Sequence, residues 1–75
     1  MTFLEVCYRY PGKLTAAQLR RLGELTGVYG LRRIRVEEDR NLIHVEFDAS
    51  RLKETEALRV LRGAGIPLSE KVEIA

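Results

Sequence analysis

The sequence predicts an α+β fold in which two strand–helix–strand units are joined by a β-hairpin. Residues 28–48 contain two apolar runs with a polar turn between them, which is typical of a hairpin. A strand pattern and a helix pattern precede this hairpin, and a second helix pattern and a last strand pattern follow it. The predicted order of elements is therefore βαββαβ.

The first strand is predicted over residues 2–10. Apolar Leu4, Val6 and Tyr8 alternate there with residues of the opposite face, which is the period expected of a half-buried strand. The Pro-Gly pair at positions 11 and 12 ends the strand, because both residue types favour turns.

The first helix is predicted to begin at Thr15 and to end before Gly27. Thr15 and Gln18 have the spacing of a capping box, in which each side chain accepts a hydrogen bond from the backbone N–H of the other residue. The glycine at position 27 is a natural left-handed cap. One broad apolar face is formed by Ala16, Leu19, Leu22 and Leu25.

The first strand of the hairpin is less regular than the second. Its apolar residues keep a period of two only from Ile34 onward, and the longer step from Leu31 to Ile34 predicts a β-bulge or a late strand start. Residues 38–41 read Glu-Asp-Arg-Asn and form the turn, because Asp and Asn tolerate left-handed backbone. The second strand alternates through Ile43, Val45 and Phe47.

The second helix is predicted over residues 54–63 and the last strand over residues 68–74. Glutamates lie in the first turn of this helix and arginines towards its end, which is the favourable order for the helix dipole. Gly63 and Gly65 end the helix, and Pro67 prevents it from resuming.

Together the elements predict one ferredoxin-like domain over residues 1–75. Two right-handed crossovers joined by a hairpin give a four-stranded antiparallel sheet of order 4-1-3-2, with both helices on one face. A chain of 75 residues buries too little surface for a second core. The expected core consists of Leu4, Val6, Leu19, Leu22, Ile34, Val36, Val45, Phe47, Leu58, Leu61 and Val72.

The other face of the sheet has no helix to cover it and is expected to be open to solvent. Phe3 and Leu42 would leave an apolar patch there, and such patches on small proteins mark interaction sites. We therefore expect this face to bind a protein partner or a second copy of the chain in a homodimer. The predicted interaction residues are Phe3, Cys7, Arg33, Arg35, Leu42 and His44, with Glu5 and Glu46 beside them.

Composition and charge exclude several classes of protein. With 45% hydrophobic and 32% charged residues, the chain is globular and not disordered. It contains neither the roughly 20 apolar residues of a membrane span nor a signal-peptide pattern, and its single cysteine agrees with a reducing compartment. We therefore expect a cytoplasmic protein without a membrane partner. No nucleic-acid partner is expected, because the net charge is only +2 and the third strand has no exposed aromatic residue.

Cys7 and His44 are the weak candidates for a metal site. They would lie on neighbouring strands of the open face, but two ligands are too few for a structural zinc site unless a second subunit completes it. As a nucleophilic pair they lack an orienting Asn or Asp and an oxyanion hole. We therefore predict no metal site, no cofactor and no enzymatic activity.

Several segments between the first helix and the last strand occur in a recognisable order. They are Gly27-Val28, the hairpin, the Val-Glu-Phe-Asp stretch at residues 45–48, a short helix, and Ala64-Gly65. Over residues 27–66 the chain resembles the heavy-metal-associated (HMA) domain of copper chaperones and metal-pumping ATPases. The resemblance implies the same βαββαβ fold.

The HMA family binds metal through a Cys-x-x-Cys loop between the first strand and the first helix. The corresponding positions in this chain fall on or near Pro11 and Leu14, and residues 10–14 contain no cysteine. Soft thiolates select Cu(I) or Zn(II), and Lys13 adds a positive charge where a cation would lie. We therefore expect the fold of the family without its metal-binding loop.

The sequence favours a small, non-catalytic binding or protein-interaction module that resembles an HMA domain but lacks its metal-binding cysteines. Two alternatives remain open at this point. One is an ACT-like regulatory module, which shares the βαββαβ topology and binds small effectors at subunit interfaces. The other is a metal-binding or metallochaperone domain that uses non-standard ligands.

Overall fold

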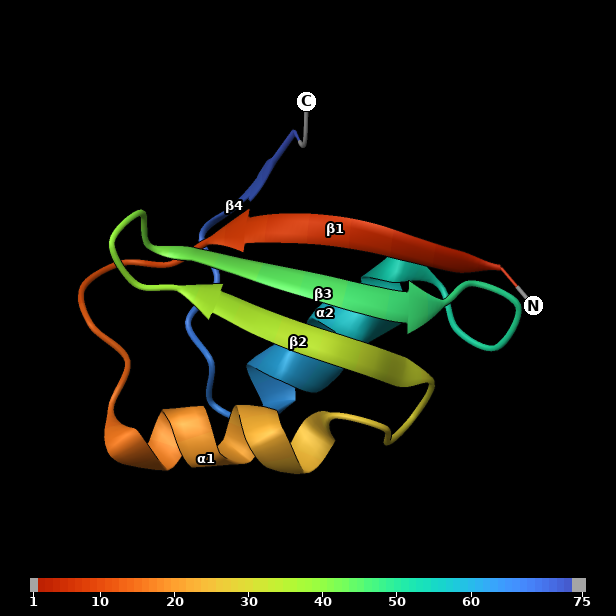
Figure 1. Cartoon of the computed structure of the whole chain (residues 1–75), viewed down its shortest axis with the longest axis horizontal. Helices are drawn as coiled ribbons and strands as arrows, with labels where there is room; N and C mark the ends of the chain where they lie inside the picture. Colours follow the sequence, from red (N-terminus) through yellow and green to blue (C-terminus); the bar gives the residue numbers. More distant parts are fainter. Residues whose placement is uncertain (1, 74–75) are drawn as a thin grey trace.

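The computed structural model describes residues 2–73 and contains the predicted order of elements, βαββαβ (Figure 1). The elements are β1 (Phe3–Arg9), α1 (Ala16–Leu25), β2 (Leu31–Glu37), β3 (Leu42–Asp48), α2 (Glu54–Gly63) and β4 (Glu70–Val72). The strands form one four-stranded antiparallel sheet of order β2-β3-β1-β4. The predicted ferredoxin-like fold and its strand order are confirmed.

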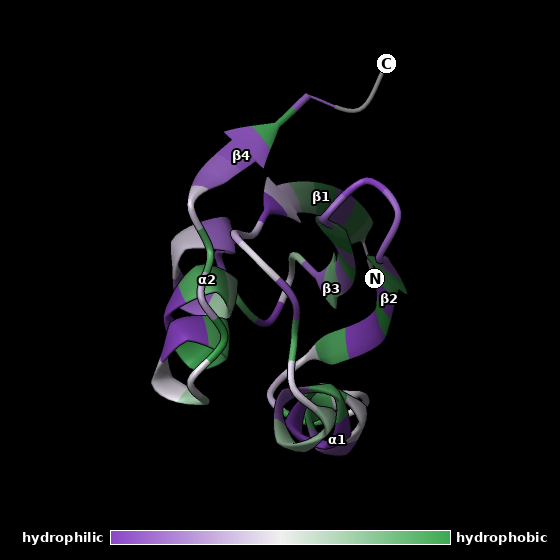
Figure 2. Ribbon diagram, turned by 90° about the vertical axis from the view of Figure 1, so that its left-hand side faces the viewer, coloured by the Kyte–Doolittle hydropathy of each residue, from purple (hydrophilic) through white to green (hydrophobic). Residues whose placement is uncertain are grey.

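β1 and β3 form the centre of the sheet. They pair over their whole lengths, from Phe3 opposite Asp48 to Arg9 opposite Leu42. Both helices lie on the same side of the sheet, and within residues 2–73 no helix or strand covers the opposite side (Figure 2). We call this uncovered side the outer face.

The start of β2 is determined by the loop before it. Gly27, Tyr29 and Gly30 have φ angles of 85°, 57° and 85°, which are incompatible with a strand. β2 therefore begins at Leu31, and its register with β3 shifts between Leu31 and Arg33. Both the late strand start and the β-bulge that the sequence indicates are present.

The last strand is shorter than predicted. β4 covers Glu70–Val72 and not residues 68–74. Leu68 is buried but precedes the strand, and residue 74 lies outside the described residues. The predicted first strand differs from β1 by one residue at each end, and the predicted second helix matches α2.

The capping box of α1 is confirmed. The N–H of Gln18 donates to Thr15 Oγ1 at 3.1 Å, and the N–H of Thr15 donates to Gln18 Oε1 at 2.8 Å. The Gln18 side chain also donates from Nε2 to the carbonyl of Gly65 at 3.1 Å, just after the end of α2. The cap therefore connects the start of one helix to the end of the other.

The core lies between the sheet and the helices and is centred on β3. Ile43, Val45 and Phe47 on this strand are no more than 1% exposed. The predicted core residues Val6, Leu22 and Leu61 are also buried, while Ile34, Val36 and Leu58 pack against the core and are partly buried. The core further includes Tyr8, Tyr10, Leu31, Leu52, Ala57, Ile66 and Leu68.

The prediction of Leu4 and Leu19 as core residues is wrong, because they are 50% and 37% exposed. Leu4 lies in the half of β1 that β4 does not reach, since β4 pairs only with residues 7–9. Leu19 lies beside an open hollow next to the loop that precedes α1. Val72, at the edge of the sheet, is half-buried.

Two leucine-to-alanine variants test where the core lies. Leu61 is fully buried, so Leu61→Ala should lower the free energy of unfolding by about 2 to 5 kcal/mol, through lost burial and the cavity it leaves. Leu19→Ala removes the same atoms from an exposed position and should cost less than about 1 kcal/mol. Urea unfolding followed by circular dichroism measures both values, and equal losses would contradict the placement of the core.

Candidate functional site

The residues predicted for the interaction face do lie together on the outer face. The strand register places Cys7 opposite His44, and Arg35 opposite His44 on its other side. Their exposure differs from the prediction, because Cys7, Leu42 and His44 are 1%, 6% and 9% exposed. Phe3 is 39% exposed, and Arg33 and Arg35 are exposed. The prediction that Leu42 forms an exposed apolar patch is therefore wrong.

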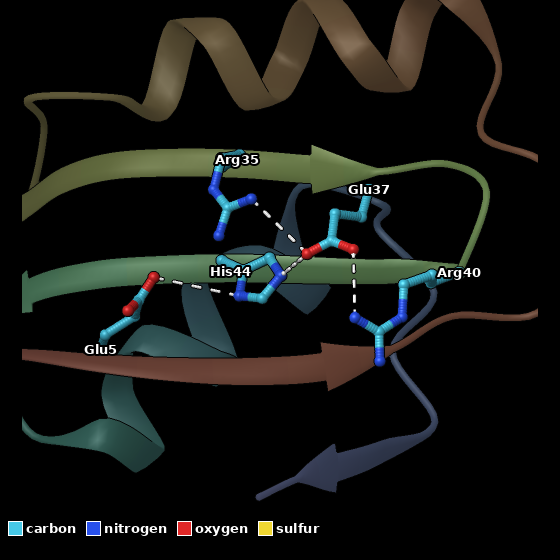
Figure 3. A network of polar contacts seen from close by, with 5 residues as sticks. All are labelled: Glu5, Arg35, Glu37, Arg40 and His44. Carbon is cyan, nitrogen blue, oxygen red and sulfur yellow. Dashed lines mark hydrogen bonds and ion pairs between the residues drawn. The ribbon is translucent and has the colours of Figure 1, made fainter. Parts of the chain in front are cut away.

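A network of charged side chains surrounds His44 on this face (Figure 3). The carboxylate of Glu37, at the end of β2, lies 2.7 Å from His44 Nε2. The same carboxylate is 3.5 Å from Arg35 Nη1 and 3.7 Å from Arg40 Nη1. These side chains come from β2 and the β2–β3 turn and converge on Glu37, beside the imidazole of His44. Glu37 thus connects His44 on the central strand β3 to two arginines of the outer face.

The hydrogen bond to Glu37 assigns roles to the two ring nitrogens of His44. A carboxylate can only accept, so Nε2 carries the proton that is donated to Glu37. Nδ1 is buried and has no hydrogen-bond partner within residues 2–73. Glu5 Oε1 lies 3.9 Å from Nδ1, which is too far for a hydrogen bond. The imidazole is therefore held from one side only.

A similar arrangement lies at the N-terminal end of the outer face. Arg32 lies over the ring of Phe3, with its guanidinium carbon 4.3 Å from the ring centroid, and its Nε is 3.3 Å from Glu46 Oε1. Such cation–π contacts at exposed sites contribute about 0.5 to 1 kcal/mol. The β-bulge at this position helps to bring Arg32 onto the outer face.

Cys7 lies beneath this network. Burial raises the pKa of its thiol, and the nearby carboxylates of Glu37 and Glu5 raise it further. The thiol form is therefore favoured over the thiolate, which is the form that attacks electrophiles and binds soft metals. Within residues 2–73 no group of three His, Cys, Asp or Glu side chains is placed to hold a metal ion.

The loop between β1 and α1 is pinned to the β2–β3 turn. The side-chain amide of Asn41 donates to the carbonyls of Tyr10 and Gly12, at 2.9 and 2.7 Å. The backbone N–H of Tyr10 in turn donates to the carbonyl of Asn41 at 3.0 Å. Asn41 has a φ of 55°, a left-handed conformation that asparagine tolerates better than most residues. The exposed side chain of Lys13 is the one charged group that the loop itself contributes.

A surface hollow lies elsewhere, on the helix side of the sheet. Its volume is about 510 Å³, and it is bordered by the α1–β2 loop, the β3–α2 loop and α2. Tyr29 lines it and is 68% exposed. The sequence did not single out this residue, because it lies in the segment before β2, where the apolar residues have no regular spacing. The available signal was an aromatic residue between two glycines, Gly27 and Gly30.

Comparisons with known proteins identify the fold. No protein-family model matches the chain, and no curated protein matches it. The structure is similar to that of oxidized MerP from Ralstonia metallidurans CH34, with a TM-score of 0.71 and 20% sequence identity. The match covers 91% of this chain and 96% of that chain. The chain therefore has an HMA-like fold, and at this identity the likeness shows the fold alone.

None of the helices in the described chain has the length and hydrophobicity needed to cross a membrane.

The Glu37 network predicts a specific dependence of stability on pH. The hydrogen bond from His44 holds the pKa of Glu37 below its ordinary value of 4.5, with Arg40 and Arg35 acting in the same direction. The stabilisation by this carboxylate is complete above the ordinary pKa and is lost as the pH falls through the lower pKa of the folded state. Between neutral pH and about pH 3, the wild type should lose more unfolding free energy than Glu37→Gln.

Urea unfolding at several pH values, with Glu38→Gln as the matched control, measures this difference. Glu38 is an exposed neighbour without an ion-pair partner in the described residues, so its variant should follow the wild type. The pKa of Asp48 is also lowered, chiefly by a hydrogen bond from Ser50, and its contribution is common to all three proteins. Identical acid dependence of the wild type and Glu37→Gln would contradict the role of Glu37.

Proposed function

We propose that this chain is a small, non-catalytic protein-binding module with an HMA-like fold that does not bind metal at the loop between β1 and α1. The observation that carries the proposal is the structure of that loop. Its backbone carbonyls at Tyr10 and Gly12 accept hydrogen bonds from Asn41, and its residues supply no thiolate. The donors needed for a soft metal are absent from residues 10–14.

The remaining soft donor does not replace them. Cys7 is 1% exposed, and burial raises the pKa of its thiol. Its cross-strand neighbour His44 already directs Nε2 to Glu37. A metal at this position would require the thiol to lose its proton among carboxylates that oppose this loss. The residues present therefore do not fit a Cu(I) or Zn(II) site.

The same geometry argues against nucleophilic catalysis. Glu37 does orient the imidazole of His44, which is the partner that sequence reasoning could not name. However, the raised pKa of Cys7 disfavours the thiolate, and both members of the pair are buried. A nucleophile must be both activated and accessible to its substrate. Binding is the function that this arrangement supports.

A metal titration tests the proposal. The reduced protein is titrated with Cu(I) or Zn(II) at neutral pH against a chromogenic chelator, beside Cys7→Ser as the matched variant. Because one buried thiol cannot form a chelating pair, both proteins should leave the metal with the chelator, and circular dichroism should not change on metal addition.

Stoichiometric capture of one metal ion per chain that disappears in Cys7→Ser would overturn the proposal. In that case the chain would be a metal-binding domain with non-standard ligands. Capture that persists in Cys7→Ser would equally contradict it, since the metal would then be bound by nitrogen and oxygen donors.

A further inference from the structure

Two neighbouring hollows form a groove on the helix side of the molecule. One has a volume of about 510 Å³ and the other of about 270 Å³, and Tyr29 and Val60 line both. The α1–β2 loop, which borders the larger hollow, lies at the end of the molecule away from the loop at residues 10–14 (Figure 1). We call this surface the helix-side groove; it comprises Arg21, Tyr29, Arg51, Arg59 and Val60.

Tyr29 is held in an unfavourable backbone conformation at the centre of the groove. Its φ of 57° is left-handed, and such a conformation costs a residue with a side chain more than it costs glycine. The ring is 68% exposed and contributes nothing to the core. The neighbouring Gly30 packs on Leu52, since an added Cβ would lie 3.2 Å from Leu52 Cδ2. The α1–β2 loop thus contacts the β3–α2 loop and presents Tyr29 to solvent.

The groove carries a net positive charge, because its lining holds Arg21, Arg51 and Arg59 but a single carboxylate, that of Glu56. Arg21, Arg51 and Arg59 have no carboxylate at ion-pair distance among residues 2–73. The one acidic side chain in the lining, Glu56, accepts a hydrogen bond from the N–H of Lys53 at 2.9 Å and so serves the N-terminus of α2. On the outer face, Arg9, Arg32, Arg35 and Arg40 are each paired with a glutamate, whereas Arg33 has no ion-pair partner among the described residues.

We infer that the helix-side groove binds an acidic peptide segment of a partner protein. At one end of the groove, the guanidinium groups of Arg51 and Arg59 bind carboxylates of the peptide. At the other end, Arg21 binds a further carboxylate. Between the two ends, an apolar side chain of the peptide packs on Tyr29 and Val60. A small anion would engage only one end, whereas an extended segment meets both. This inference rests on the proposed binding function and deepens it by naming the chemistry of the partner.

Amide chemical shifts of the ¹⁵N-labelled protein test the inference. The probe is a synthetic peptide, blocked at both ends, in which Asp and Glu residues flank a central Phe; a matched peptide has Lys at the acidic positions. Only the acidic peptide should shift the amides of Tyr29, Gly30 and Arg59, and added salt should weaken its binding. No shift of these amides at the highest soluble peptide concentration, or shifts confined to the outer face, would overturn the inference.

Two double variants that change the net charge by the same amount distinguish binding in the groove from general electrostatic attraction. Arg51→Glu with Arg59→Glu should weaken peptide binding by about tenfold or more. Arg20→Glu with Arg33→Glu makes the same change outside the groove and should alter the affinity by less than about twofold. Equal weakening by both pairs would overturn the inference.

Tyr29→Gly separates binding from folding. Glycine suits the left-handed backbone, so the urea midpoint should not fall, while the affinity for the acidic peptide should fall by about tenfold. Unchanged affinity would overturn the role of the ring.

Inorganic phosphate is the last probe. If it shifted the same amides as strongly as the peptide, the groove would be a small-anion site and the inference would be wrong. The metal titration tests the proposed function separately. If the peptide does not bind and no metal is captured, only the inference about the groove is refuted. If metal is captured, the proposed function is refuted.

Discussion

The structure depends on how the sheet covers the face that has no helix. Glu37 is central to this cover, because its carboxylate is hydrogen-bonded to His44 and lies near Arg35 and Arg40. A histidine, a thiol and a leucine on the central strands are buried beside it, although no helix or strand within residues 2–73 lies over them. On the outer face, paired charges lie beside the buried side chains of Cys7, Leu42 and His44, while Phe3 and Arg33 are exposed. In a chain of this size, these buried side chains supplement a single small core.

The ion pairs of the outer face also determine which charged side chains are free to bind a partner. The outer-face arginines at positions 9, 32, 35 and 40 are engaged with glutamates, and Cys7 is held as a buried thiol. The pinned loop before α1 uses its carbonyls to accept hydrogen bonds from Asn41. Three arginines without an ion-pair partner in the described residues lie on the helix side, together with the most exposed aromatic ring, that of Tyr29. The HMA-like fold is kept, and the binding of a protein is the function that we propose for this surface.

Local patterns in the sequence were sufficient for the fold and not for the site. The capping box at Thr15, the turn at residues 38–41 and the alternation in β3 each act over a few residues, and with the handedness of crossovers they lead to the strand order. Alternation also placed Leu42 on the correct face, but it could not show that side chains from β2 and the turn cover that face. Tyr29 was missed because its exposure depends on a left-handed loop, which has no periodic signal.

The accessibility of Cys7 tests most directly whether the outer face is closed. A neutral maleimide is the suitable reagent, because it is not repelled by Glu5 and Glu37, and Cys7 is the single thiol of the chain. The account predicts that labelling of the native protein is slower than labelling of the urea-unfolded chain at the same pH by about a hundredfold or more, with the rate rising as urea opens the fold. Native labelling as fast as that of the unfolded chain would contradict the account, because it would place the thiol in reach of solvent, metals and substrates.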